Sequence, residues 1–293
     1  MALHAGEHGS EHVDLAGRWT LDPLPLASAA VAALLFALGW RQLRRRGRAD
    51  LASGGRAALF GAGLVVLLLA LLSPLDPIGE EYLLSAHMLQ HVLLGDVAPL
   101  LLVLGLSGTL ALFVVPRPLL RAAGRNRPAR AGLRFLTRPA TAVVVWIAVM
   151  AGWHIPVLFE YALEHRWAHD LEHATMFLAG FLLWLQIAGA VPRSRMSHGR
   201  RAALAVAMLA VGMVISQTIF LADPLYSVYL EQPERLLGLS AKGDQVRAAM
   251  LMTTEQLLTL GTAAGLLVWT HVERAEEQAR EERTSEDPPV PAA

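Results

Sequence analysis

The chain has 293 residues, and its 25 lysines and arginines balance its 25 aspartates and glutamates. Hydrophobic residues make up 54% of it and charged residues only 17%, below the roughly 25% that is usual in soluble proteins. The zero net charge gives no indication of a nucleic-acid partner, and we expect none. The absence of cysteine excludes disulfides and thiolate metal sites, so histidine, methionine and carboxylates remain as metal ligands.

The charged residues are grouped between long apolar runs, and the mean hydropathy is +0.43. This pattern predicts an all-α polytopic membrane protein, in which each run of about 20 residues crosses the lipid bilayer as a helix. We predict a bundle of seven transmembrane helices over residues 24–40, 57–75, 83–104, 140–158, 168–190, 202–221 and 246–269. The apolar stretch 105–115 is too short to span, and it either prolongs the third helix past a kink at Pro99 or lies in the interface.

These spans divide the chain into three parts. Residues 1–23 form an N-terminal segment that contains histidines, residues 24–270 form the transmembrane domain, and residues 271–293 form an acidic tail. The composition of the tail predicts a short helical continuation followed by disorder. The first twenty residues lack a basic region followed by an apolar stretch, so we expect no cleaved signal peptide.

The basic residues of the loops predict the orientation in the membrane. Six arginines lie in 41–56, seven in 116–138, four in 192–201 and three in the tail, whereas the alternate segments carry four lysines and arginines in all. Because basic loops stay in the cytoplasm, the N-terminus is expected outside and the C-terminus inside.

Six histidines lie in or beside spans, and the orientation brings all of them toward the outer face; one of them, His165, lies in a loop next to Trp167 and suits the membrane interface. His87 with His91, and His169 with His173, are pairs four residues apart, so each pair presents two imidazoles on one helix face. Imidazole suits copper, zinc and iron, a thioether adds a soft ligand, and an ionisable group inside a span marks a functional site. The residues expected to hold a metal are His87, His91, His154, His169, His173 and Met250.

Other side chains are expected to assist this site. Asp96, Glu172 and Glu255 are candidate acceptors that orient the imidazoles. The external histidines are expected to help capture metal without being required, and they are His4, His8 and His12. A structural alternative stays open for some residues: a membrane histidine such as His154 also forms interhelical hydrogen bonds, methionines also fill cores, and the N-terminal histidines also suit a polar tail.

Several ordered segments together resemble a known family. They are HMLQHVLLGDVAPLLLVLG at 87–105, WHIPVLFEYALEHRWAHDLEHATMFLAGFLLW at 153–184, DPLYSVY at 223–229, DQ at 244–245, and Met250. Over about residues 57–269 the chain resembles the membrane cytochrome c oxidase assembly factors of the CtaG type. The resemblance adds Gln90, which we group with the acceptors. The chain departs from the family pattern after the Asp-Gln pair, where it has Arg247-Ala248-Ala249 and then, after Met250, LMTTEQ at 251–256. We expect this departure to change how the last helix presents Glu255.

The resemblance implies a non-enzymatic, multi-pass protein of the bacterial plasma membrane that is needed to make an active haem–copper cytochrome c oxidase. We expect it to bind copper at the outer histidines and to deliver the ion to an oxidase subunit. The alternative is a haem-binding or haem-inserting protein, in which His91 and His173 from facing helices supply bis-histidine ligation.

Overall fold

The computed structural model describes residues 17–106, 108–115, 117–190, 196–233 and 235–286, and these residues form helices and no strand. The longer helices are α1 (Pro23–Arg45), α2 (Gly54–Leu72), α9 (Pro139–Trp153), α11 (Arg166–Ile187), α12 (His198–Leu221), α14 (Ala241–Gln256) and α15 (Thr262–Glu286). The shorter ones are α3 (Leu75–Glu81), α4 (Leu84–Val92), α5 (Ala98–Gly105), α6 (Gly108–Val114), α7 (Arg117–Arg125), α8 (Arg127–Leu136), α10 (Pro156–Glu164) and α13 (Ser227–Glu231). Two π-helical turns, η1 (Leu93–Val97) and η3 (Leu257–Gly261), and the 3-10 turn η2 (Leu236–Gly238) complete the set.

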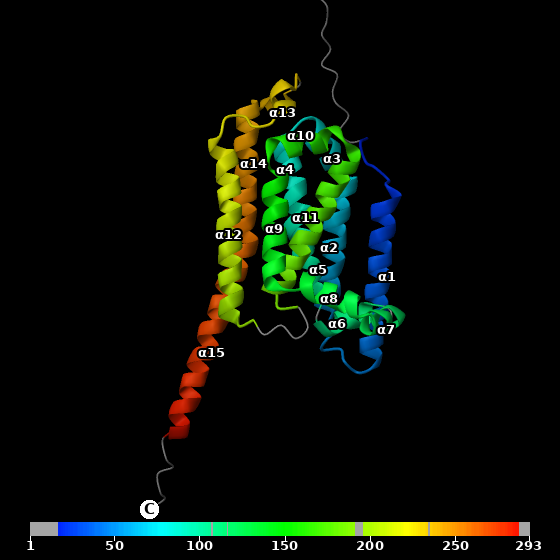
Figure 1. Ribbon diagram of the computed structural model, residues 1–293, viewed down its shortest axis with the longest axis vertical. Helices are drawn as coiled ribbons and strands as arrows, with labels where there is room; N and C mark the ends of the chain where they lie inside the picture. Colours follow the sequence, from blue (N-terminus) through cyan, green and yellow to red (C-terminus); the bar gives the residue numbers. More distant parts are fainter. Residues whose placement is uncertain (1–16, 107, 116, 191–195, 234, 287–293) are drawn as a thin grey trace, which may run out of the picture.

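The long helices run side by side in one bundle (Figure 1). Helix α1 lies at one side of it and α12 with α14 at the other, while α11 contacts α5, η1, α9 and α10 in the interior. The short helices α3, α10 and α13 cover one end, which we call the α3 end. Helices α6, α7 and α8 lie at the opposite α8 end, where α15 leaves the bundle.

Five helical segments are long and apolar enough to cross a membrane, and a sixth is added if two bent helices are counted as one span. The five are Pro23–Arg45, Gly54–Leu72, Leu84–Gly105, His198–Leu221 and Ala241–Arg283, and the bent pair is α8 with α9 at 65°. Helix α11, expected as a span over 168–190, is not among them because its first turns carry charged and imidazole side chains. The number seven and the orientation therefore stay predictions.

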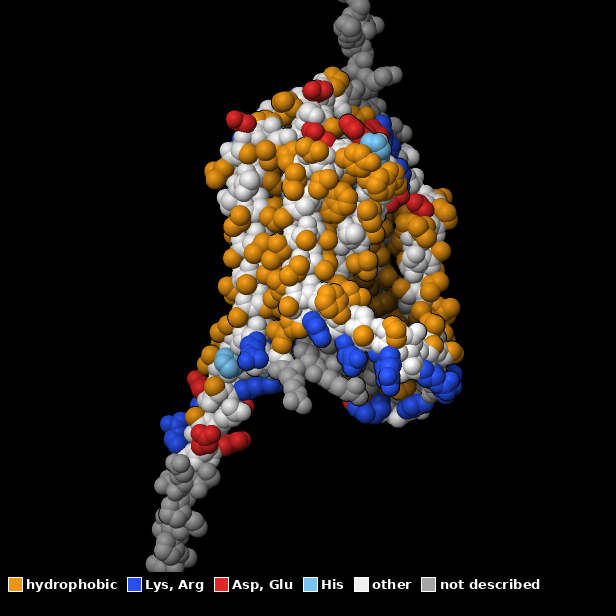
Figure 2. All heavy atoms as spheres, in the orientation of Figure 1, with side chains coloured by type: hydrophobic (Ala, Val, Ile, Leu, Met, Phe, Trp, Pro, Cys, Tyr) orange, Lys and Arg blue, Asp and Glu red, His pale blue; other side chains and the backbone are white. Residues whose placement is uncertain are grey.

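Charge separates the two ends of the bundle. Figure 2 shows most Lys and Arg side chains at the α8 end and along α15, with a mainly hydrophobic surface between the two ends. The basic side chains at the α8 end include those of α7 and α8, the two short helices of the arginine-rich 116–138 loop. The tail continues as α15 to Glu286, and residues 287–293 lie outside the described part.

The sequence determines where several helices begin. Side-chain oxygens of Asp22, Ser53, Ser197 and Ser240 accept hydrogen bonds from the first turns of α1, α2, α12 and α14. Such caps satisfy backbone N–H groups that have no partner within the helix. Helices α9 and α10 begin instead at a proline, whose fixed φ suits the first helical position.

Between α4 and α5 the α-helix gives way to the π-helical turn η1, which ends two residues before Pro99. Pro99 is the residue at which the sequence predicts a kink. Pro99 has no N–H, so it cannot donate to the carbonyl of Gly95, four residues earlier. Helix α11 crosses at this carbonyl: a Cβ atom on Gly180 would lie 1.8 Å from the Gly95 oxygen. Glycine at 180 therefore permits the close contact that sets α11 against α4 and α5.

We predict that Gly180→Ala destabilises the bundle by at least about 1–3 kcal/mol, the usual cost of overpacking, because its methyl group would meet backbone and not a flexible side chain. Gly61→Ala in α2 is the matched control, since no atom lies within 4 Å of a Cβ there. Thermal unfolding of the two purified variants in detergent checks this. Equal melting temperatures for both variants would show that the close contact is absent.

Candidate metal centre

Helices α4 and α11 bring the two expected histidine pairs together near the α3 end. The ring centres of His87 and His169 are 5.5 Å apart, and those of His91 and His173 are also 5.5 Å apart. Within each helix the two rings lie 4.3 Å and 4.0 Å apart. All four residues are 6% exposed or less, so they form one buried group, which we call the histidine cluster.

Contacts from other helices hold α4 in place. The carboxylate of Asp244 in α14 accepts hydrogen bonds from the backbone N–H groups of Leu84 (2.6 Å) and Ser85 (3.2 Å) and from the Ser85 hydroxyl. An acidic group at this position caps the first turn of α4 and is favoured by the helix dipole. On the other side, a Cβ atom on Gly79 would lie 2.8 Å from the Cα of His87, so glycine lets α3 approach α4 closely.

Three sets of nitrogen and oxygen atoms in the described residues are close enough to share one ion; one is formed by Asp76, Glu80 and His169, and the other two include His87 of the cluster. One atom each from His87, His169 and His173 forms a group within 4.8 Å, and so does one atom each from His87, His91 and Glu172. The Nε2 atoms of His87 and His91 are 2.8 Å apart, and Oε1 of Glu172 lies 3.6 Å from Nε2 of His91. Both Glu172 oxygens are buried and have no hydrogen-bond partner in the described residues.

Hydrogen bonds determine which nitrogens carry a lone pair. The Nδ1 of His169 lies 2.8 Å from Oε1 of Glu80, and a carboxylate only accepts, so Nδ1 of the neutral ring carries the proton. The Tyr229 hydroxyl donates to the Gly79 carbonyl (2.6 Å), so its oxygen accepts from Nδ1 of His87 (3.3 Å). Both rings therefore present an Nε2 lone pair to the cluster, which is the arrangement typical of histidines that bind metals.

Glu80 lies on α3, outside the candidate spans, and is only partly buried. Burial acts to raise the pKa of its carboxyl, but the hydrogen bond from His169 and the positive charge of Arg166 outweigh it and lower the pKa. Glu80 is thus ionised at neutral pH and acts as an acceptor for the imidazole.

His154 lies beside the cluster, 6.2 Å from His91 between ring centres. It follows the last turn of α9, and its Nδ1 is 2.6 Å from the carbonyl of Met150. The structure therefore brings together all five expected histidines, four in the cluster and one next to it.

The structure does not bring Met250 to the histidines. Its side chain is 56% exposed and lines an outer groove between α4 and α14 with Leu89 and Leu251. Met252, two residues later, faces the interior and lines a cavity with His91 and His154. Residues two apart on a helix point about 200° away from each other, so only one of the two methionines can face inward.

The expected acceptors take different places. Of the four, Glu172 lies beside an imidazole, whereas Gln90 donates to Asp76 (2.5 Å) and to the Ala70 carbonyl (3.0 Å) and so joins α4 to α3 and α2. Asp96 in η1 accepts from the Thr259 hydroxyl (2.7 Å) and from the Trp184 indole. Glu255 is next to Asp96, so these two acids form a pair separate from the cluster.

Residues that the sequence analysis missed orient the cluster, namely Glu80 and Tyr229. Both lie in connections between spans, and their partners are His169 and His87, which are 89 and 142 residues away in the chain. No spacing rule links residues so far apart. The expected auxiliary histidines His4, His8 and His12 lie outside the described residues.

The family model that describes cytochrome c oxidase caa3 assembly factors (Caa3_CtaG) matches residues 34–274. The chain belongs to this family. Among curated relatives of the chain, an uncharacterised protein of Mycobacterium bovis and one of Mycobacterium tuberculosis are each 31% identical to it over 186 residues, and one of Mycobacterium leprae is 27% identical over 187 residues. The matched region is 60% of this chain and only 27% of each relative, so the relatives are much longer proteins. No solved structure matches the chain.

Proposed function

We propose that this assembly factor binds copper at the histidine cluster and delivers the ion to a subunit of cytochrome c oxidase. The observation that carries the proposal is the convergence of four buried imidazoles and a buried carboxylate on one space. Burying this many polar groups is costly unless they are hydrogen-bonded or bind an ion. Five nitrogens and oxygens among them have no hydrogen-bond partner in the described residues, namely Nδ1 of His91, Nε2 of His169, Nε2 of His173 and both oxygens of Glu172.

The imidazole ligands suit a protein that carries a copper ion and releases it. Imidazole suits copper, zinc and iron, and membership of an oxidase assembly family supports the choice of copper among them. A carrier must also release its ion, so we expect two or three of the four imidazoles to bind at one time, with the remaining ring available for exchange. The role is non-catalytic: copper is the cargo, and no bond of a substrate is made or broken.

Haem is the second candidate, since His91 and His173 face each other from α4 and α11. The room around these two rings is too small for a haem. The ring of His91 lies 4.3 Å from that of His87, the ring of His173 lies 4.0 Å from that of His169, and the adjoining cavity has a volume of about 50 Å³. Pockets for cofactors of that size measure roughly 300–1,000 Å³. A metal ion fits this space and a haem does not.

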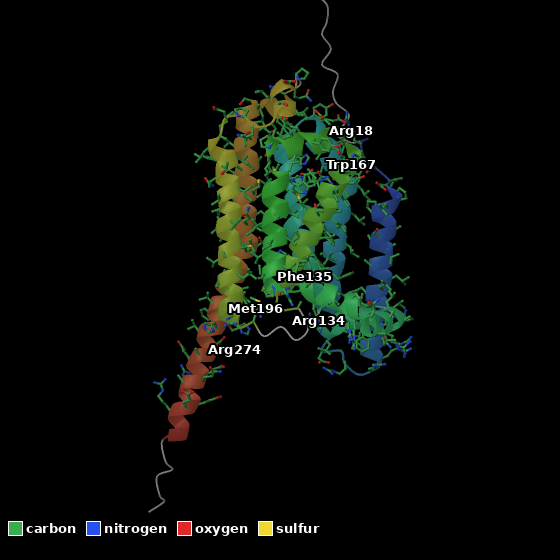
Figure 3. All side chains as sticks on the ribbon, in the orientation of Figure 1. Arg18, Arg134, Phe135, Trp167, Met196 and Arg274 are labelled. Carbon is green, nitrogen blue, oxygen red and sulfur yellow. The ribbon has the colours of Figure 1, made fainter. Side chains whose placement is uncertain are left out.

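We further propose that the protein lies in the bacterial plasma membrane as seven spans, with α11 as the span enclosed by the others. Figure 3 shows Arg18 and Trp167 at the α3 end and Arg134 and Arg274 at the opposite end. Because basic residues stay on the cytoplasmic side, the α8 end faces the cytoplasm and the histidine cluster lies near the outer face. In this orientation His4, His8 and His12 are outside, where they assist capture of the ion.

The orientation predicts the behaviour of fused reporters. A reporter that is active only in the cytoplasm should be active when fused after Arg125 or after residue 275, and inactive when fused within residues 226–242. Enzyme assays on cells that carry each fusion check this. An active fusion within 226–242 would place the histidine cluster on the cytoplasmic side and contradict the proposal.

The copper site predicts the effect of removing single imidazoles. His91→Ala and His173→Ala should each leave a folded, inserted protein, because a buried polar group in lipid costs free energy. Each should lower bound copper at least tenfold and leave the oxidase inactive. His165→Ala is the control, since that ring stacks on Tyr161 outside the cluster and should change neither quantity. Full copper and full oxidase activity in both cluster variants would show that these histidines are structural.

The orienting role of Glu80 predicts a change in affinity without a change in ligands. Glu80→Ala removes the acceptor for Nδ1 of His169 and should weaken Zn(II) binding 10- to 100-fold, as loss of such partners does elsewhere. Glu80→Gln keeps an acceptor oxygen and should retain most of the affinity. Titration of the purified protein measures both, with Glu81→Ala, which removes an exposed ion pair to Arg18, as the control. Equal affinities for all three variants would refute this role.

A further inference from the structure

A small cavity lies next to the histidine cluster, and its lining is unusual for the interior of a helical bundle. It has a volume of about 50 Å³, about that of one or two water molecules. Two imidazoles and three thioethers line it, those of His91, His154, Met88, Met150 and Met252. The size suits one ion, and the lining is rich in soft ligands.

His154 presents a lone pair in this space. Its Nδ1 is 2.6 Å from the Met150 carbonyl, which can only accept, so Nδ1 carries the proton and Nε2 has the lone pair. That Nε2 is buried and has no hydrogen-bond partner in the described part of the chain. A histidine whose other nitrogen donates to a carbonyl is already oriented as a metal ligand.

His91 presents the second lone pair. Its Nε2 lies 2.8 Å from Nε2 of His87, and that atom accepts because the proton of His87 is on Nδ1. His91 therefore donates through Nε2 and has its lone pair on Nδ1, which is buried and has no partner among the described residues. With metal–nitrogen bonds of about 2 Å, one ion between two imidazoles leaves their ring centres roughly 5–6 Å apart. The observed distance between His91 and His154 is 6.2 Å.

We propose that this cavity is a second metal site, which holds one cuprous ion between Nδ1 of His91, Nε2 of His154 and the thioethers of Met150 and Met252. Thioethers are soft ligands and select Cu(I) over harder or divalent ions. The carboxyl groups of Asp96 and Glu255 line the same cavity, and as an adjacent acid pair that shares one proton they supply one negative charge near the cation. The inference rests on the proposed copper function and adds a second position for the ion.

His91 then belongs to both sites. A neutral imidazole has one lone pair, so His91 binds an ion through Nε2 in the histidine cluster or through Nδ1 in the cavity. An ion bound at Nε2 requires the ring proton on Nδ1, and an ion bound at Nδ1 requires it on Nε2, which lies 3.6 Å from Oε1 of Glu172. Copper stays cuprous throughout, and the two sites compete for the ring.

The experiment loads the full-length protein in detergent with Cu(I) under anaerobic conditions and records X-ray absorption at the copper edge. The wild type should show copper–sulfur scattering. The double variant Met150→Leu, Met252→Leu should lose it and bind Cu(I) at least tenfold more weakly. Its Zn(II) affinity should stay within twofold of the wild type, because zinc uses the histidine cluster. Met250→Leu, on the outer face of the same helix, should change none of these quantities.

A measurement without substitutions complements the variants, because protein labelled with selenomethionine should show copper–selenium scattering. Scattering from nitrogen alone in the wild type and the labelled protein would overturn the second site and leave the proposed function standing. Copper–sulfur scattering that persists in the double variant would also overturn the second site and leave the proposed function standing. A wild type that binds neither Cu(I) nor Zn(II) would overturn both proposals.

Discussion

The hydrogen bond between Nδ1 of His169 and Glu80 is the interaction on which the histidine cluster depends. It joins α11 to α3 at the end of the bundle and, by holding the proton on Nδ1, directs the Nε2 lone pair inward. Tyr229 has the same effect on His87 from a third segment of the chain. Without these partners a buried imidazole could turn its N–H toward the cluster, and the group would offer hydrogen-bond donors where an ion needs lone pairs.

Backbone packing brings the two histidine pairs to one level. Gly180 lets α11 lie against the carbonyl of Gly95, which cannot accept from the residue four positions on because Pro99 has no N–H. Asp96 in η1 accepts a hydrogen bond from Thr259 in η3, so the two π-helical turns contact each other. Asp96 and His91 both line the small cavity next to the histidine cluster. Such π-helical turns occur frequently at functional sites, and here they lie beside the cavity that Asp96 and Glu255 line together with His91 and His154.

Sequence analysis predicted what depends on local spacing. The helical class, the limits of most of the seven predicted long helices to within about five residues and the two histidine pairs follow from periodicity, because residues four apart share a helix face. The choice between Met250 and Met252 depends on how α14 is rotated, which spacing does not determine. The contacts of Glu80 and Tyr229 depend on how the connections fold over the α3 end. Helix α11 was expected as an apolar span, but its polar first turns lower its hydropathy.

Nitrogen-15 magnetic resonance of histidine-labelled protein tests the central claim most directly, because it distinguishes a protonated ring nitrogen from one with a lone pair. In the metal-free protein, His87 and His169 should carry their protons on Nδ1, and addition of Cu(I) should shift their Nε2 signals and leave the Nδ1 protons in place. Substitution of each residue by glutamine assigns the signals. Protons on Nε2 in the metal-free protein, or Nε2 signals that do not respond to Cu(I), would contradict the account.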